Sequence, residues 1–271
     1  MAEKETKNEL KKIIEVIPEE KSESDETNAP SEEIEAELSY AEKRILRDKK
    51  ELKEKISSWV PKTQIGKDVK SGKEKDIDNI LENRRRILET EIVDSLIQLE
   101  TDLINIGQAK GKFGGGKRRA WRQTQKKTKE GNVLSFSAMA VMGDRKGHIG
   151  LGLGKAKETL PSREKAIRKA KLNIFKIRRG FENPSDKFKE QYKNDPHTLP
   201  YVVEGKCGSI RIKLIPAPRG TGLVVGDECK KILNLAGIKD AYSFTKGNVR
   251  TAFNLAKACI DALNKTTEMK I

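Results

Sequence analysis

The sequence is poor in the residues that build disulfide frameworks and metal centres. Its 271 residues include only two histidines and three cysteines. Cys207, Cys229 and Cys259 lack the short paired spacing of zinc ligands, and their odd number prevents all three from pairing with one another. The composition therefore excludes a histidine-rich metal site. We expect the cysteines to be small buried residues in a reducing compartment.

Long hydrophobic runs are also absent. Apolar residues make up 35% and aromatic residues 5% of the chain, and no stretch approaches the ~18 apolar residues of a membrane span. The first residues, MAEKETKNELKK, contain no apolar segment of a signal peptide. We therefore expect a cytoplasmic protein with no membrane partner and with small hydrophobic cores.

Positive charge is what the sequence has in excess, and the excess lies in one block. Lys and Arg number 56 against 41 Asp and Glu, a formal charge of +15. Residues 101–180 hold 21 basic and 5 acidic residues, a net of +16, whereas residues 1–100 have a net of −6. Such a block is typical of nucleic-acid-binding proteins and less often of proteins that bind anionic membranes. A well-solvated basic surface without a specific partner is the alternative.

The centre of this block predicts a β-hairpin followed by a helix. Residues 133–142 and 148–154 have the length and composition of strands, and the glycine-flanked stretch 143–147 predicts the turn between them. Ser162 is the expected cap of the helix. Four apolar residues at helical spacing predict its buried stripe: Ile167, Ala170, Ile174 and Ile177.

The second strand of this hairpin has one apolar face and one face of glycines. Alternate side chains point to opposite faces of a strand, so Gly150 and Gly152 oppose three apolar residues: Ile149, Leu151 and Leu153. We expect the apolar face to join the core and the glycine face to be an outer surface that lets an RNA backbone approach closely. Three residues would supply donors at its rim: His148, Lys155 and Lys157. The alternative is that the glycine face packs under a helix or under the second domain.

The residues before this hairpin complete a helix–strand–strand–strand–helix order. The acidic stretch 1–58 is typical of a largely disordered or helical extension. Apolar residues recur at helical spacing through 76–106, which predicts one long helix. A loop at 107–116 and a polar strand at 121–128 follow, and the chain turns back at 129–132. This order is shared with double-stranded-RNA-binding domains.

Residues 201–271 predict a second, smaller α/β domain. Strands are expected at 202–203 and 210–215, where apolar residues alternate with basic ones. A helix should span about 227–237, since it would end at a glycine, a favourable residue after a helix C-terminus. A last helix should end near Leu263.

Several motifs resemble the ribosomal protein S5 family of the small ribosomal subunit and occur in that family's order. They include KTKEGNVLSF at 127–136, GHIGLGLGKAKE at 147–158 and PAPRGTGLV at 216–224. The motif WVPKT at 59–63 is similar to the archaeal and eukaryotic branch of this universal family. The resemblance extends over about residues 59–263.

The resemblance implies an α+β protein in two parts. A double-stranded-RNA-binding-like domain over 59–180, a three-stranded antiparallel sheet with two helices, would be followed by a linker at 181–200. An α/β domain with a left-handed strand–helix–strand crossover would occupy 201–271. The family implies a structural constituent of the small subunit that binds ribosomal RNA near the mRNA entry and decoding region and supports assembly and translational accuracy. The implied partners are ribosomal RNA, neighbouring ribosomal proteins and mRNA, without a cofactor or enzymatic activity.

The expected RNA-binding residues are the tip of the first hairpin, residues of the basic block and basic residues of the second domain. The family contacts RNA with this tip, although Glu130 and Asn132 depart from its usual residues. The full set is Lys117, Arg118, Arg119, Arg122, Lys126, Lys127, Lys129, Gly131, Asn132, Arg145, Lys146, His148, Gly150, Gly152, Lys155, Lys157, Arg163, Arg168, Arg178, Arg179, Lys206, Arg219, Lys246 and Arg250.

Two other functions fit parts of the sequence. The glycines at 150–154 suggest the nucleotide loop of an enzyme, but a phosphate loop needs glycine at 149 and Ser or Thr at 156, where this chain has Ile149 and Ala156. A dinucleotide-binding turn would need glycine in place of Lys155. A free-standing RNA-binding protein or RNA chaperone stays open, because the basic block fits it as well.

Overall fold

The computed structural model describes residues 47, 50–51, 54–108, 118–181 and 196–268. The chain divides into two compact units, Met1–Glu51 and Leu52–Ile271, and the sheets belong to the second. Most of the predicted extension, most of the predicted linker and the predicted RNA contact Lys117 lie outside the described residues. None of the described helices is long and apolar enough to cross a membrane.

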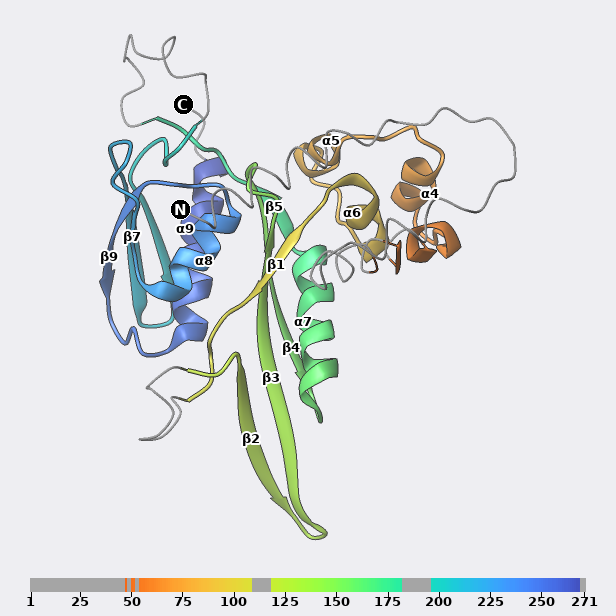
Figure 1. The fold of residues 1–271 in the computed structure, drawn as a ribbon, viewed down its shortest axis with the longest axis horizontal. Coiled ribbons are helices and arrows are strands. Elements are labelled where there is room, and N and C mark those ends of the chain that lie inside the picture. Colours follow the sequence, from red (N-terminus) through yellow and green to blue (C-terminus); the bar gives the residue numbers. More distant parts are fainter. Residues whose placement is uncertain (1–46, 48–49, 52–53, 109–117, 182–195, 269–271) are drawn as a thin grey trace, which may run out of the picture. The chain divides into compact units, whose positions relative to one another are not determined.

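An antiparallel sheet is built from the basic block (Figure 1). Its strands follow the order β1-β3-β4-β5, and β2 also pairs with β3. The bounds are β1 Glu100–Leu103, β2 Trp121–Thr128, β3 Gly131–Gly143, β4 His148–Ala156 and β5 Ile174–Lys176. The strands predicted at 121–128, 133–142 and 148–154 are therefore confirmed.

The helix α7, Thr159–Leu172, packs along β3 and β4 (Figure 1). It begins before its predicted cap, because Ser162 lies inside it, is fully buried and donates a hydrogen bond to a carbonyl of β4 at 3.2 Å. Its other buried residues are Ala166 and Ala170, and Ile174 lies beyond its end in β5. The predicted stripe is therefore confirmed at Ala170 but wrong in its extent, because Ile174 and Ile177 are buried beyond the end of the helix. Small residues form the helix face that meets the sheet.

The glycine face of β4 lies directly under α7. A Cβ atom at Gly150 or Gly152 would lie closer than 3.0 Å to a backbone carbonyl oxygen of the helix, that of Ala170 or Ala166 respectively. The prediction that Gly150 and Gly152 form an outer surface for RNA is therefore wrong. The missing side chains instead allow the helix backbone to approach the strand.

The long helix predicted at 76–106 is wrong. The segment forms two short helices, α5 Ile77–Glu82 and α6 Thr90–Leu96, and then the strand β1. Arg84 has a φ of 52°, a left-handed conformation that a continuous right-handed helix does not contain. Together with α4, Gln64–Lys70, the short helices pack around a separate apolar cluster that includes Ile80, Ile92 and Val93.

A second sheet, of order β6-β7-β9-β8, forms near the C-terminus. The bounds of its strands are β6 Val203–Cys207, β7 Ile210–Pro216, β8 Leu223–Val224 and β9 Ala241–Lys246. Strand β8 pairs in parallel with β9, and α8, Asp227–Leu235, connects the two, as the implied strand–helix–strand unit requires. The strand predicted at 210–215 is confirmed, and the one predicted at 202–203 continues to Cys207.

Two helices complete this half of the fold (Figure 1). Helix α8 ends where predicted, at Gly237, whose φ of 80° closes the last turn. Helix α9, Ala252–Glu268, runs past the predicted end near Leu263 and packs on β6 and β7. A Cβ atom at Gly205 of β6 would lie closer than 3.0 Å to the carbonyl oxygen of Ala258 in α9. This helix, like α7, therefore rests on a strand glycine.

One apolar core joins the two sheets. Met139 and Ile149 of the first sheet belong to the same buried cluster as Leu214 of the second sheet and Leu233 of α8. Ile149 is fully buried, with two partly buried leucines of β4 against the same cluster, so the predicted role of the apolar face of β4 is confirmed. Strand β4 and the end of β3 from Ala138 onward are therefore covered by α7 on one side and by this core on the other. The predicted domain boundaries stay predictions.

Candidate nucleic-acid interface

The first basic element is a two-stranded ribbon formed by β2 and the start of β3. Residues 122–134 are all exposed, and β4 pairs with β3 only from Phe136 onward. The ribbon extends beyond the rest of the sheet in Figure 1. Thr128 pairs with Gly131, so Lys129 and the next residue form the predicted turn. A ribbon of two strands buries little apolar surface of its own, which leaves its side chains available to a partner.

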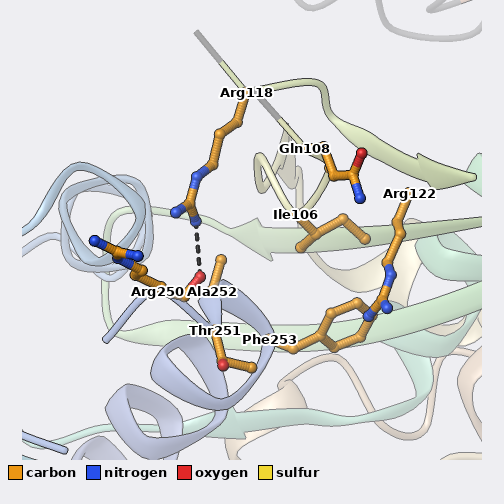
Figure 2. Close-up of a pocket in the computed structure, with 9 residues that line it drawn as sticks. Ile106, Gln108, Arg118, Arg122, Arg250, Thr251, Ala252 and Phe253 are labelled. Atoms are coloured by element: carbon orange, nitrogen blue, oxygen red, sulfur yellow. Dashed lines mark hydrogen bonds between the residues drawn. The ribbon is translucent and has the colours of Figure 1, made fainter. Parts of the chain in front are cut away.

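A pocket at the base of this ribbon gathers three of the predicted arginines (Figure 2). Arg118, Arg122 and Arg250 line a volume of about 340 Å³, which we call the arginine pocket. The remaining lining residues carry no charge: Ile106, Gly107, Gln108, Thr251, Ala252 and Phe253. Three guanidinium groups without an acid in the lining create a positive potential that attracts anions.

The arginine pocket is assembled from both halves of the sequence. The Nη1 of Arg118 donates a hydrogen bond to the backbone carbonyl of Arg250 at 2.9 Å, as Figure 2 shows. Arg250 lies in the loop that leads into α9, whereas Arg118 precedes β2. The pocket therefore exists only when the two halves of the fold are in place.

Trp121 brings two further arginines together beside the ribbon. The guanidinium carbons of Arg119 and Arg163 lie 5.9 and 5.6 Å from the centre of its indole rings. Arg119 precedes β2 and Arg163 comes from α7, so the ring joins cations from a strand end and a helix. Cation–π contacts of this kind hold guanidinium groups in place without neutralising their charge.

A second basic pocket lies where the β3–β4 turn meets the end of α8, and we call it the junction pocket. Arg145, Lys146, Arg179 and Lys239 line its volume of about 570 Å³. The backbone N–H of Arg145 donates to the carbonyl of Leu235 at 2.9 Å, and Arg179 Nη1 donates to the carbonyl of Arg145 at 3.2 Å. Arg145 also forms an ion pair with the exposed Glu100 of β1, which partly offsets its positive charge. The turn is thereby fixed against α8.

The other predicted residues do not converge on these pockets. Lys155, Lys157 and Arg168 are exposed near β4 and α7, and Arg178 and Arg219 are exposed on connecting segments. Lys206 and Lys246 lie on strands β6 and β9 of the second sheet. The remaining ribbon residues stay together at its exposed end: Lys126, Lys127, Lys129, Gly131 and Asn132.

His148 is not available to RNA, and its predicted role as a donor at the rim is wrong. Its Nδ1 lies 2.6 Å from a carboxylate oxygen of Asp144 and its Nε2 lies 2.7 Å from one of Asp78. The side chain is only 11% exposed. Asp78 belongs to α5, and it also accepts a hydrogen bond from Lys176 of β5 at 2.7 Å. His148 therefore fastens α5 to the hairpin.

These contacts raise the pKa of His148 and lower the pKa values of Asp144 and Asp78. Burial alone lowers the pKa of His148, but the hydrogen bonds and charges of Asp144 and Asp78 outweigh it and raise the pKa above its usual value. Burial alone raises the pKa of Asp144 and of Asp78, but the hydrogen bonds they accept outweigh it and lower both. The two carboxylates therefore stabilise the imidazolium form of His148 relative to its neutral form.

Several lining residues were not expected from the sequence. Gln108, Thr251 and Phe253 line the arginine pocket, and Lys239 lines the junction pocket. Lys239 follows the glycine that ends α8, but only the fold places it beside the β3–β4 turn. Within the described residues, no three His, Cys, Asp or Glu side chains are grouped to hold a metal ion. Cys229 and Cys259 are buried as predicted, whereas Cys207 is only partly buried.

The sequence matches two family models in the two halves just described. The model of the ribosomal protein S5 N-terminal domain matches residues 120–178, and that of the S5 C-terminal domain matches residues 205–270. The first spans the ribbon, the hairpin and α7. The second spans the second sheet with both of its helices.

Curated relatives are similar over most of the chain. The small ribosomal subunit protein uS5 of Nanoarchaeum equitans is 45% identical over 217 residues, which cover 80% of this chain and 91% of that protein. The uS5 of Methanocaldococcus jannaschii is 43% identical over 209 residues, covering 77% and 87%. That of Hyperthermus butylicus is 41% identical over 210 residues, covering 77% and 89%. With this identity over nearly the whole length of its relatives, the chain belongs to the uS5 family of small ribosomal subunit proteins.

Proposed function

We propose that this protein is a structural constituent of the small ribosomal subunit that binds ribosomal RNA through the ribbon, the arginine pocket and the junction pocket. The arginine pocket carries the proposal, because Arg118 and Arg122 meet the distant Arg250 in its lining, which contains no acid. Arginine forms paired hydrogen bonds with phosphate oxygens. The pocket therefore suits a phosphate of the RNA backbone.

The ribbon and the pockets suit a folded RNA rather than an unstructured single strand. Phosphate contacts fix the position of a protein on RNA and carry little sequence information. The ribbon tip and the arginine pocket lie at opposite ends of β2, so a single folded RNA would have to present phosphates at both. Binding of this kind supports assembly, since it requires both the native protein and the native RNA.

The finer assignment follows from membership of the family. We propose that the protein is ribosome-bound, lies near the mRNA entry and decoding region beside other small-subunit proteins, and contributes to translational accuracy without enzymatic activity. A free-standing RNA-binding protein or chaperone would use the same basic surfaces outside the ribosome.

Sedimentation of a tagged chain in its source cells tests this function. We expect the protein in the small-subunit fraction of a sucrose gradient. The combined substitution Arg118→Ala, Arg122→Ala and Arg250→Ala should move it to the free fraction. A matched control replaces by alanine three exposed lysines that lie outside the ribbon and both pockets: Lys62, Lys67 and Lys75. Wild-type protein that binds RNA but sediments outside the small subunit would contradict the proposal and favour the free-standing protein.

A further inference from the structure

The second sheet has one face that no described element covers. Helix α9 packs on the inner face, where Val203, Gly205 and Leu214 are buried. The alternate residues of β6, β7 and β9 point the other way, as strand geometry requires. We call this side the outer face and define it by Glu204, Lys206, Arg211, Lys213, Ile215, Val224, Tyr242, Phe244 and Lys246.

Two aromatic side chains stand exposed at the centre of the outer face. Tyr242 is 39% and Phe244 is 55% exposed. Both lie on β9, an inner strand of the sheet, two residues apart and therefore about 7 Å apart along the strand. The Nζ of Lys246 lies 5.7 Å from the centre of the Phe244 ring. With Ile215 and Val224 beside Tyr242, the two rings form a contiguous apolar patch of the kind that marks an interaction site.

Basic side chains lie around Phe244 in register, whereas Tyr242 lies opposite Ile215 and Val224. Lys206 pairs with Arg211 across β6 and β7, and Arg211 pairs with Lys246 across β7 and β9. Lys213 lies opposite Phe244 and forms a 3.2 Å ion pair with Glu204, the one acid of the outer face. Four cations against one acid favour an anionic partner.

We infer that the outer face binds an unpaired RNA strand, with two bases stacked on Tyr242 and Phe244 and the phosphates near the surrounding cations. Four-stranded sheets with exposed aromatic residues use this arrangement for single-stranded RNA. A protein partner would also use the two rings and Arg211, but the three lysines of this face are of a type depleted in protein–protein interfaces, so RNA is the favoured partner. The site goes beyond the proposed function, which concerns backbone contacts of folded RNA.

Binding of a fluorescein-labelled twelve-nucleotide oligouridine to the full chain, followed by anisotropy, tests the inference. Replacing both rings by leucine, Tyr242→Leu with Phe244→Leu, keeps an apolar surface but removes the stacking planes. We expect this variant to bind on the order of 10-fold or more weakly. The ring-conserving pair Tyr242→Phe with Phe244→Tyr should bind within about 2-fold of wild type, since either ring can stack on a base.

Two further results separate this site from the others. The triple arginine-pocket variant should retain oligouridine binding even if its binding to folded ribosomal RNA is lost. Equal oligouridine affinity of the leucine and wild-type proteins would overturn the inference. If the leucine variant also fails to enter the small subunit while its oligouridine affinity is unchanged, the outer face is instead a protein-docking surface.

Discussion

The faces of the two sheets differ in how far other elements cover them. Both faces of β4, and of the end of β3 from Ala138 onward, are covered, one by α7 on the glycines and the other by the shared core. The second sheet is covered on one face, where α9 rests on Gly205, and exposes Tyr242 and Phe244 on the other. In this fold the strand faces that carry glycines are those on which a helix packs closely. The surfaces that we propose for partners carry long basic and aromatic side chains instead.

The largest effect should come from adding one carbon atom under α7. We expect Gly152→Ala to destabilise the protein by more than about 3 kcal/mol, because the new methyl group would meet backbone atoms of α7 rather than a flexible side chain. Thermal unfolding followed by circular dichroism measures the loss, which corresponds to a fall in Tm of at least about 6 °C.

A glycine in open space provides the control for this substitution. Gly226 precedes α8, has an ordinary φ, and has no atom within 4 Å of the position of a Cβ. Gly226→Ala should cost no more than about 1 kcal/mol. A Gly152→Ala protein as stable as wild type would show that α7 does not seal this face.

A smaller effect is expected when the ribbon loses its charge. Replacing Lys126, Lys127 and Lys129 by alanine should weaken binding to a folded small-subunit RNA fragment by about 10- to 100-fold, since about three phosphate contacts are lost. The Tm should not change, because all three side chains are exposed. Filter binding at a fixed salt concentration measures the affinity. A fall in Tm comparable to that of Gly152→Ala would instead place the ribbon in the packed part of the sheet.

The smallest effect concerns the pH dependence of the contact between α5 and the hairpin. The raised pKa of His148 means that its contribution is complete below its usual pKa of 6.5 and is lost as the pH rises through the raised value. The pKa values of Asp78 and Asp144 are lowered from 3.8, so their contributions are lost only in more acidic solution. The contact is strongest between about pH 4 and 6.5.

Comparison of wild type with His148→Gln isolates this contribution. Between pH 6 and 9 the wild-type protein should lose about 1 kcal/mol more stability than the variant, the net value of a hydrogen bond whose donor loses its charge. Urea unfolding at each pH measures the difference. Parallel stability curves for the two proteins would mean that His148 is not protonated between its carboxylates.

The sequence predicted those elements that neighbouring residues determine. The turn at 143–147 and the end of α8 at Gly237 depend on glycines at fixed positions, and both are present. The strand at 133–142 follows from a short apolar run, and the strand at 148–154 follows from alternation of apolar residues with glycines. By contrast, the predicted helix at 76–106 failed because helical spacing of apolar residues cannot reveal that Arg84 adopts a left-handed conformation.

The site was predicted in its residue types but not in its arrangement. Alternation places Gly150 and Gly152 on one face of β4, yet the position of α7 decides whether that face is open. The partner of His148 in α5 lies 70 residues away in sequence. Arg118 and Arg250 are 132 residues apart and meet only in the folded chain. In each of these cases the missing information is which element, distant in sequence, packs against the residue in question.

The salt dependence of RNA binding tests the central claim most directly. For wild-type protein and a folded small-subunit RNA fragment, neutralisation of about six phosphates predicts a fall in affinity on the order of 10³-fold between 50 and 200 mM salt. The combined Arg118→Ala, Arg122→Ala and Arg250→Ala protein should fall only on the order of 10- to 100-fold, because about three of those contacts are missing. A flat response of the wild-type protein, or an unchanged slope in the variant, would contradict the account.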